Sequence, residues 1–197
     1  MRIAVYLAHP RPDSFNRALF DAVVEELARH GADVRPHDLY SEGFDPVLSA
    51  AETDTVAGAT VADDLVHRHQ RELADLDAIV FIHPNWWGMP PAIMTGWVQR
   101  VLAPTVAYKL ETPEAEPHPL LNIKRALVLN TSDTSLAREQ TTFGDPLEQI
   151  WTACVLPYVG VEKLQRVVFR TVKDSTDDSR TTWLQEARKL AAALLAD

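Results

Sequence analysis

The sequence alternates between short, continuous runs of apolar residues and longer segments in which apolar residues recur every three or four positions. The short runs are typical of strands buried on both faces, and the longer segments are typical of amphipathic helices. Strands are predicted at residues 3–8, 34–39, 78–82, 126–129 and 164–172. Because strands that alternate with helices form parallel sheets covered on both faces, this order constrains the fold more than any other feature.

The first helical pattern runs from Phe15 to Leu27, with Asp13 and Ser14 before it as N-terminal caps and Gly31 after it as a stop. Residues 103–122 hold four of the 13 prolines and show no period, so they predict a long loop. Further helices are predicted over residues 61–76, 90–102, 147–158 and 183–194.

Five strands of these lengths fit a flavodoxin-like, doubly wound parallel sheet of order 2-1-3-4-5, with residues 1–197 forming one domain. Such sheets bind ligands at the carboxyl ends of their strands, where the strand order reverses. We therefore expect the functional residues in the loops at 9–16, 83–91 and 130–144.

The formal net charge is −9, from 19 Lys and Arg against 28 Asp and Glu. This balance argues against nucleic acid as a partner, because binding to phosphates requires a basic surface. The first residues show no signal-peptide layout, and no apolar run is long enough for a membrane span. We expect a cytoplasmic protein.

Cys154 is the single cysteine, which excludes an internal disulfide and a cysteine-based zinc site. We predict no metal site. In a helix over residues 147–158, Cys154 shares an apolar face with Ile150 and Trp151, so we expect a small core residue rather than a redox thiol.

The loop at 9–16 lacks both the GxGxxG pattern of dinucleotide folds and the GK[ST] of phosphate loops. It offers instead a helix N-terminus together with the imidazole of His9, the hydroxyl of Ser14 and the amide of Asn16. These groups suit a phosphate or pyrophosphate. The alternative is that Ser14 only caps the helix and His9 is an ordinary loop residue.

Two adjacent tryptophans, Trp86 and Trp87, follow the strand at 78–82. A loop tip would expose both rings to water at considerable cost unless a ligand or a partner covers them. A flat aromatic ligand is one such cover and a dimer contact is another, since tryptophan is enriched at interfaces. The two interpretations are compatible.

Several motifs occur in the order seen in two-electron flavin quinone reductases. Ala8-His9 is followed by Ser14-Phe15-Asn16 and Asp38-Leu39-Tyr40, and the later motifs are FDPVLS at 44–49, PNWWGMPPAI at 84–93 and GWVQRV at 96–101. The chain resembles the flavodoxin-like NAD(P)H dehydrogenase (quinone) family over essentially its whole length. That family includes DT-diaphorase, bacterial drug-activity modulators and ancillary oxidoreductases of potassium-efflux systems.

The resemblance implies a flavin, FAD or FMN, that is reduced by NAD(P)H. Residues of the first loop would hold its phosphates, and residues 84–88 would line its ring. Gln70 and Arg180 favour FAD, although each could instead be an ordinary solvated helix residue. The flavin-binding residues implied are His9, Ser14, Phe15, Asn16, Gln70, Pro84, Asn85, Trp86, Trp87, Gly88, Asn130, Thr131, Ser132 and Arg180.

The sequence departs from the family pattern at two places. Ser132 and Asp133 replace a Gly-Gly pair, which brings a carboxylate toward the flavin. Ala137 and Phe143 stand where the family's reductases place a Tyr and a His that stabilise charge during hydride transfer. We therefore assign no catalytic residue.

The first functional hypothesis is an NAD(P)H-dependent flavin oxidoreductase with a quinone-like acceptor, in which the flavin carries the redox chemistry. The alternative is a flavin-binding regulatory or ancillary subunit, for example of a transport system, with weak reductase activity. An electron-carrier flavodoxin fits poorly because the first loop is not rich in Ser, Thr and Gly. We also expect a homodimer with the flavin ring near its interface.

Overall fold

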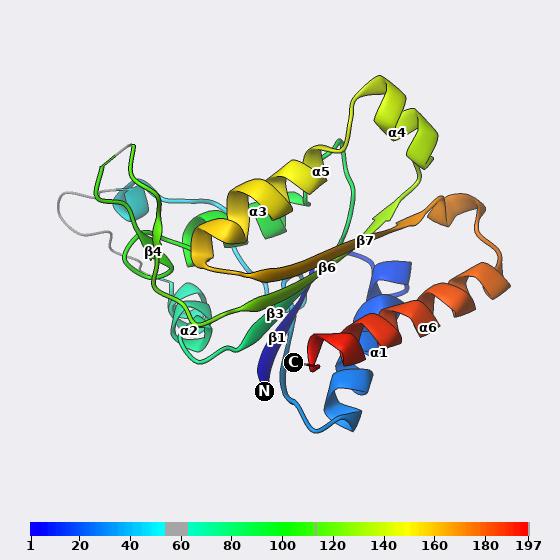
Figure 1. Cartoon of the computed structure of the whole chain (residues 1–197), viewed down its shortest axis with the longest axis horizontal. Helices are drawn as coiled ribbons and strands as arrows, with labels where there is room; N and C mark the ends of the chain where they lie inside the picture. Colours follow the sequence, from blue (N-terminus) through cyan, green and yellow to red (C-terminus); the bar gives the residue numbers. More distant parts are fainter. Residues whose placement is uncertain (54–62, 113, 197) are drawn as a thin grey trace.

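The computed structural model describes residues 1–53, 63–112 and 114–196. Within them, five strands form a parallel sheet in the order β2-β1-β3-β6-β7 (Figure 1). This arrangement confirms the predicted order 2-1-3-4-5. The strands are β1 Arg2–Leu7, β2 Asp33–Asp38, β3 Ala78–Pro84, β6 Arg125–Ser132 and β7 Lys163–Arg170.

Helices cover both faces of the sheet. Helices α1 (Phe15–Arg29) and α6 (Asp177–Leu194) lie on one face. The other face carries α2 (Asp64–Leu73), α3 (Ala92–Val101) and the helical segment that begins with α5 (Pro146–Glu148) (Figure 1). The sheet is therefore enclosed between two helical layers, as the alternating sequence pattern predicts.

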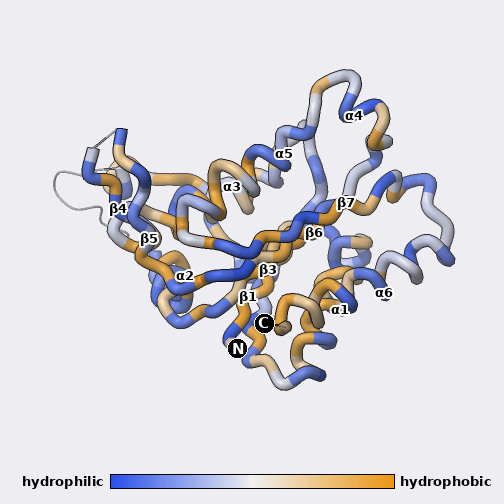
Figure 2. Tube along the Cα trace, viewed as in Figure 1, coloured by the Kyte–Doolittle hydropathy of each residue, from blue (hydrophilic) through white to orange (hydrophobic). Residues whose placement is uncertain are grey.

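Strands β1, β3 and β6 divide their side chains between two hydrophobic cores, because successive residues of a strand point to opposite faces. In β1, Val5 and Leu7 pack against the layer of α1 and α6, whereas Ala4 and Tyr6 pack against α2 and α3. All of them are buried. Figure 2 shows the central strands β1 and β3 as largely hydrophobic segments in the middle of the molecule, as expected for a sheet covered on both faces.

The predicted long loop at 103–122 is mostly irregular but contains a short antiparallel pair, β4 (Tyr108–Lys109) and β5 (His118–Pro119). The loop expected at 130–144 also contains a short helix, α4 (Leu136–Thr142), with Ser135 as its cap. Both were missed because elements this short do not complete a hydrophobic period. Short 3₁₀ turns occur at Ala50–Thr53 (η1), Pro157–Val159 (η3) and Val172–Asp174 (η4).

The predicted α-helix over residues 147–158 is wrong in its geometry. After α5 the chain forms a π-helix, η2 (Gln149–Val155), and then the turn η3. A π-helix bonds residue i to i+5, so side chains beyond its start no longer follow the α-helical faces. Trp151 remains fully buried, but Cys154 is exposed, and the prediction that Cys154 is a core residue is wrong.

Helix α2 begins at Asp64, after the carboxylate of Asp63, which accepts the backbone N–H groups of Leu65 and Val66. The first two residues of the predicted helix at 61–76 lie outside the described residues. Among the described helices, none is long and apolar enough to cross a membrane.

The segment after β2 crosses helix α3 at very short range. A Cβ atom on Gly96 would lie only 2.3 Å from the backbone oxygen of Pro46, so glycine alone fits at this position. The guanidinium of Arg100, which is buried, holds the same segment by donating to the Asp45 carbonyl at 2.6 Å and to Glu52 at 2.7 Å. This contact fixes residues 45–52 against α3.

Candidate active site

A cleft of about 800 Å³ lies at the carboxyl edge of the sheet, where the loops after β1, β3 and β6 meet. Its volume is in the range of small-molecule and cofactor sites. The convergence of these three loops agrees with the expectation for an open parallel sheet. Of the residues implied by the resemblance, those that border the cleft are His9, Ser14, Phe15, Asn16, Pro84, Asn85, Trp86, Trp87, Gly88, Thr131, Ser132 and Arg180.

Two of the implied residues lie away from the cleft lining. Gln70 is buried in α2, and its amide nitrogen donates to the carbonyl oxygen of Arg100 at 2.9 Å. Asn130 is buried in β6, where its amide nitrogen lies 3.0 Å from Nε2 of His83 and its oxygen accepts from Arg166 at 2.7 Å. In this structure both side chains are engaged in the protein's own hydrogen bonds.

The cleft also contains residues that the sequence interpretation did not assign to flavin binding. Arg11 and Asp133 lie in loops that the strand pattern had singled out, so their inclusion could have been inferred. Lys173 and Val172 come from the turn after β7, which contains no motif that would have indicated a binding role. The unassigned residues are Arg11, Asp133, Thr134, Arg138, Phe143, Pro146, Val172 and Lys173.

The charge of the cleft contrasts with that of the whole chain. Arg11, Arg138, Lys173 and Arg180 border it, and Asp133 is the one carboxylate among the described lining residues. The chain as a whole has a formal net charge of −9. A local excess of cations in a cleft attracts anionic ligands, and phosphate groups are a suitable class.

The N-terminus of α1 opens into this cleft. The Ser14 hydroxyl accepts the backbone N–H of Arg17 at 3.2 Å, which confirms its capping role and leaves its own hydrogen available to donate. The amide of Asn16 donates to the Thr131 hydroxyl at 2.9 Å. The Asn16 Oδ1 atom is buried and has no hydrogen-bond partner among the described residues, which is costly unless a ligand supplies a donor.

His9 closes the first loop on itself. Its Nδ1 atom accepts the backbone N–H of Arg11 at 3.1 Å, and partial burial lowers the pKa of the imidazole. The ring is therefore neutral near pH 7 and carries its hydrogen on Nε2. His9 also contacts Trp86, with 5.9 Å between the ring centroids. It thus offers a single hydrogen-bond donor beside an aromatic surface.

Trp86 and Trp87 lie in a tight turn closed by two backbone hydrogen bonds between Trp86 and Met89, of 3.0 and 3.1 Å. Its two central residues have positive φ, 58° for Trp87 and 76° for Gly88, as in type I′ turns. The turn exposes 40% of Trp86 and 96% of Trp87. The expectation that both rings are exposed at a loop tip is confirmed.

Hydrogen bonds from three elements hold the tryptophan turn in place. The backbone N–H of Asn85 donates to the Thr131 carbonyl at 2.7 Å, and the side-chain oxygen of Asn85 accepts from Gly88 at 2.9 Å. The side-chain nitrogen of Asn85 donates to Glu139 at 3.2 Å, and Glu139, which is buried, pairs with Arg170. The turn is thereby fixed to β6, α4 and β7 before any ligand binds.

His83 lies behind this turn and is fully buried. Its Nδ1–H donates to the Pro84 carbonyl at 2.8 Å, and its Nε2 accepts the indole N–H of Trp151 at 3.0 Å. Burial lowers the pKa of His83 to about 4, so the imidazole is neutral at pH 7. It supports the end of β3 without bordering the cleft.

Known proteins resemble the chain along almost all of its length. Rat (Rattus norvegicus) NAD(P)H dehydrogenase (quinone) 1 is 27% identical over 95% of this chain and 75% of its own. An uncharacterized NAD(P)H oxidoreductase of Haemophilus influenzae is 28% identical over 100% of this chain and 97% of its own. The structure of an NAD(P)H:quinone oxidoreductase from Methanothermobacter marburgensis matches with a TM-score of 0.83 and 27% identity, covering 97% of each chain.

The flavodoxin-like fold family matches residues 1–194. The named relatives just described are NAD(P)H oxidoreductases, two of them acting on quinones by name. The chain therefore belongs to the flavodoxin-like family, and the resemblance to NAD(P)H dehydrogenases (quinone) that its loop motifs indicated is confirmed.

Proposed function

We propose that residues 1–197 form one flavin-binding domain that oxidises NAD(P)H and passes the electrons through the flavin to a quinone-like acceptor. The observation that carries this proposal is that one cleft combines a cationic helix N-terminus with two exposed tryptophan rings. The first suits phosphates and the second suits a flat ring system. The names of the full-length relatives favour an enzyme over an ancillary subunit.

The residues of the cleft fit a flavin. The buried, unpaired Oδ1 of Asn16 needs a donor, which a flavin's ribityl hydroxyls can supply. The volume of about 800 Å³ accommodates a cofactor of this size. Arg180 borders the cleft and is a second cationic contact for a dinucleotide, so we propose FAD, with FMN as the alternative.

The chain's own residues bind, orient and shield the cofactor. The backbone N–H groups at the start of α1 and the Ser14 hydroxyl donate to its phosphates, and Arg11 and Lys173 balance their charge. The fixed turn at 86–89 presents Trp86 to the ring and excludes water from it. The bound flavin supplies the hydride and electron transfer. Phe143, which borders the cleft, carries no proton that it could donate.

A second copy of this chain is proposed to cover the open side of the cleft. Two large apolar side chains that border the cleft, Trp87 and Phe143, are exposed. Met89 of the tryptophan turn and Leu136 of α4 are exposed as well. Exposed apolar side chains beside a binding cleft are typical of an interface. Sedimentation of the flavin-loaded protein should show a dimer at micromolar concentration, whereas a fully loaded monomer would contradict the proposal.

The activity is tested by mixing the purified, flavin-loaded protein with NADPH or NADH and a soluble quinone. We expect oxidation of the nicotinamide that depends on the quinone, disappears after the flavin is removed, and returns when FAD or FMN is added. Chromatography of the flavin released on denaturation identifies the cofactor. Oxidation no faster than that given by free flavin would contradict an enzymatic role and favour an ancillary one.

A further inference from the structure

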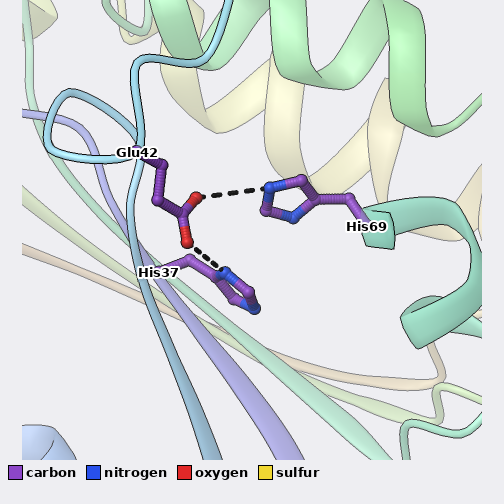
Figure 3. Close-up of side chains that lie close together, drawn as sticks. All are labelled: His37, Glu42 and His69. Atoms are coloured by element: carbon purple, nitrogen blue, oxygen red, sulfur yellow. Dashed lines mark hydrogen bonds and ion pairs between the residues drawn. The ribbon is translucent and has the colours of Figure 1, made fainter. Parts of the chain in front are cut away.

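A second polar cluster lies apart from the cleft, at the end of β2 and beside helix α2. Figure 3 shows its members, which are His37 of β2, Glu42 of the following turn and His69 of α2. Both histidines are buried, and His69 is inaccessible to solvent. None of the three borders the cleft, and the proposed reaction uses none of them.

The three side chains point toward one another (Figure 3). The Nδ1 atom of His37 lies 2.8 Å from Oε1 of Glu42, and Nε2 of His69 lies 3.3 Å from Oε2 of the same carboxylate. One atom from each residue falls within 4.8 Å of the other two. In a tetrahedral zinc site, bonds of about 2.0–2.1 Å place ligand atoms about 3.3 Å apart, so the most distant of these atoms would have to approach each other by up to about 1.5 Å.

Two of these atoms make one polar contact among the described residues, which is the contact with each other. Nε2 of His69 and Oε2 of Glu42 are both buried, and the ion pair of 3.3 Å between them, drawn in Figure 3, does not have the geometry of a full hydrogen bond. A cation bound between them would replace this one long contact with two bonds to nitrogen and oxygen ligands.

The far side of each imidazole ring already has a polar neighbour. Nε2 of His37 donates to the carboxylate of Glu72 at 2.8 Å, and Nδ1 of His69 lies 3.5 Å from the hydroxyl of Tyr6. Histidines that bind metals typically donate their second N–H in this way, which fixes the ring and its tautomer. The arrangement leaves Nδ1 of His37 and Nε2 of His69 facing the carboxylate of Glu42.

We propose that His37, Glu42 and His69 form a binding site for a divalent transition-metal ion, with Zn²⁺ as the best fit. Two imidazoles and one carboxylate are common zinc ligands, and water can complete the tetrahedron. Ca²⁺ and Mg²⁺ are poorer candidates because they prefer oxygen ligands. The bound ion would link β2 and its following turn to α2, so its role is structural. A shallow groove bordered by Glu42, Asp64 and Arg68 provides the entrance.

A metal ion competes here with a proton and with one arginine. Burial disfavours the charged form of His37, but its hydrogen bonds to Glu42 and Glu72 outweigh this and raise the pKa to about 9. Arg68 lies 3.5 Å from Oε1 of Glu42, and its side chain is 54% exposed, so it can turn into solvent. The rival arrangement is therefore a proton-bridged network without metal.

The first test uses the unmodified protein, freed of metal with a chelator and titrated at about pH 7, 8 and 9, because binding should tighten as protons compete less at higher pH. Titration calorimetry with Zn²⁺ should show saturable binding of one ion per chain. Co²⁺ should give the intense visible bands of a tetrahedral complex, and Zn²⁺ should abolish them. No stoichiometric binding, or the weak bands of an octahedral Co²⁺ complex, would overturn the proposal in favour of the proton-bridged network.

The second test uses variants. Glu42→Gln removes the anionic ligand while keeping its shape and should abolish stoichiometric binding. Glu72→Gln leaves the three ligands in place but weakens the support of His37, and should lower the affinity about 10-fold to 100-fold. His118→Gln, which removes an exposed histidine of β5, is the control and should bind Zn²⁺ as the unmodified protein does.

Circular dichroism and the flavin content of each variant show whether it has folded. Zn²⁺ binding that is unchanged in Glu42→Gln, or that is lost equally in His118→Gln, would contradict the assignment. If a glutamate variant does not fold, the Co²⁺ spectrum of the unmodified protein still decides the question.

Discussion

Two pairs of tryptophans in this chain occupy opposite environments. Trp97 and Trp151 are fully buried, and both pack against Phe81, Trp97 edge-on at 5.5 Å and Trp151 stacked at 4.7 Å between ring centroids. Trp86 and Trp87 are 40% and 96% exposed at the cleft. The first pair contributes to the stability of the fold, whereas the second contributes little to it. An aromatic residue that the fold does not need, in a turn that the fold holds rigidly, indicates a binding function.

The backbone shows the same contrast. Trp97 lies within helix α3 and Trp151 within the π-helix η2. Trp87 instead has φ of 58°, a left-handed conformation that costs a bulky residue about 1–3 kcal/mol. The network of Asn85 and Glu139 that holds this turn maintains the strained conformation. The comparison therefore predicts opposite effects for substitutions in the two pairs.

The largest effect is expected for Trp97→Ala. Removing a fully buried indole leaves a cavity, and the free energy of unfolding should fall by about 3–5 kcal/mol. Urea denaturation followed by circular dichroism measures it. A loss below about 1 kcal/mol would show that Trp97 is not part of a closely packed core.

The next largest effect is a pH dependence of stability produced by His83, which accepts the indole N–H of Trp151. Because burial holds the pKa of His83 at about 4, its contribution to stability is fully present above about pH 6.5 and is lost as the pH falls toward 4. The contribution is about 3 kcal/mol for a shift of this size. Urea denaturation at several pH values should show this decline, and it should be shallower in His83→Gln. If the unfolding free energy fell equally steeply with pH in the unmodified protein and in His83→Gln, His83 would be excluded as the cause.

The exposed pair should behave in the opposite way. Trp87→Gly should leave the unfolding free energy unchanged or raise it by about 1 kcal/mol, because glycine tolerates positive φ. The same change should weaken flavin binding or quinone reduction, while Trp87→Phe, which keeps an aromatic ring, should retain more of both. Strong destabilisation of Trp87→Gly would mean that the turn belongs to the structural core.

The smallest effect is expected for Cys154→Ala. Because the π-helix exposes this thiol, its removal should change the unfolding free energy by no more than about 0.5 kcal/mol and leave turnover intact. Thermal denaturation and the quinone assay check both. A loss of activity in a folded variant would give Cys154 a function that its position outside the cleft does not suggest.

The sheet could be predicted from the sequence because the central strands β1, β3 and β6 are nearly continuous apolar runs, and the more polar edge strands β2 and β7 follow from the regular alternation with helices. The π-helix could not, because residues 147–158 show an α-helical period and tertiary packing overrides it. That single departure moved Cys154 from the core to the surface. Helix α4 was missed because its sequence is polar and short.

Most of the residues that line the cleft could be predicted, because loops at the carboxyl edge of parallel strands converge. Lys173 was missed because its turn follows the edge strand β7, for which no motif gave a signal. Gln70 was assigned to the site by resemblance alone, and Asn130 by resemblance together with its place in the predicted loop 130–144, and the structure gives each a hydrogen-bond partner inside the protein. The cluster of His37, Glu42 and His69 has no recognisable spacing, since only the pairing of β1 with β2 and the packing of α2 bring it together.

The central claim is that the cleft binds flavin phosphate at the start of α1, and Ser14→Asp tests it most directly. Aspartate caps a helix as well as serine does, so the fold should persist, and circular dichroism confirms this. The matched control is Thr176→Asp, which makes the same kind of change at the exposed cap of α6.

We measure flavin affinity by titrating each flavin-free protein with FAD and FMN and following tryptophan fluorescence. A lost charge-assisted contact of about 1.5–3 kcal/mol, with repulsion added, should weaken binding at least about tenfold in Ser14→Asp and leave Thr176→Asp unchanged. The account therefore predicts that Ser14→Asp purifies folded and nearly colourless. A folded, yellow Ser14→Asp protein with full flavin content would contradict it.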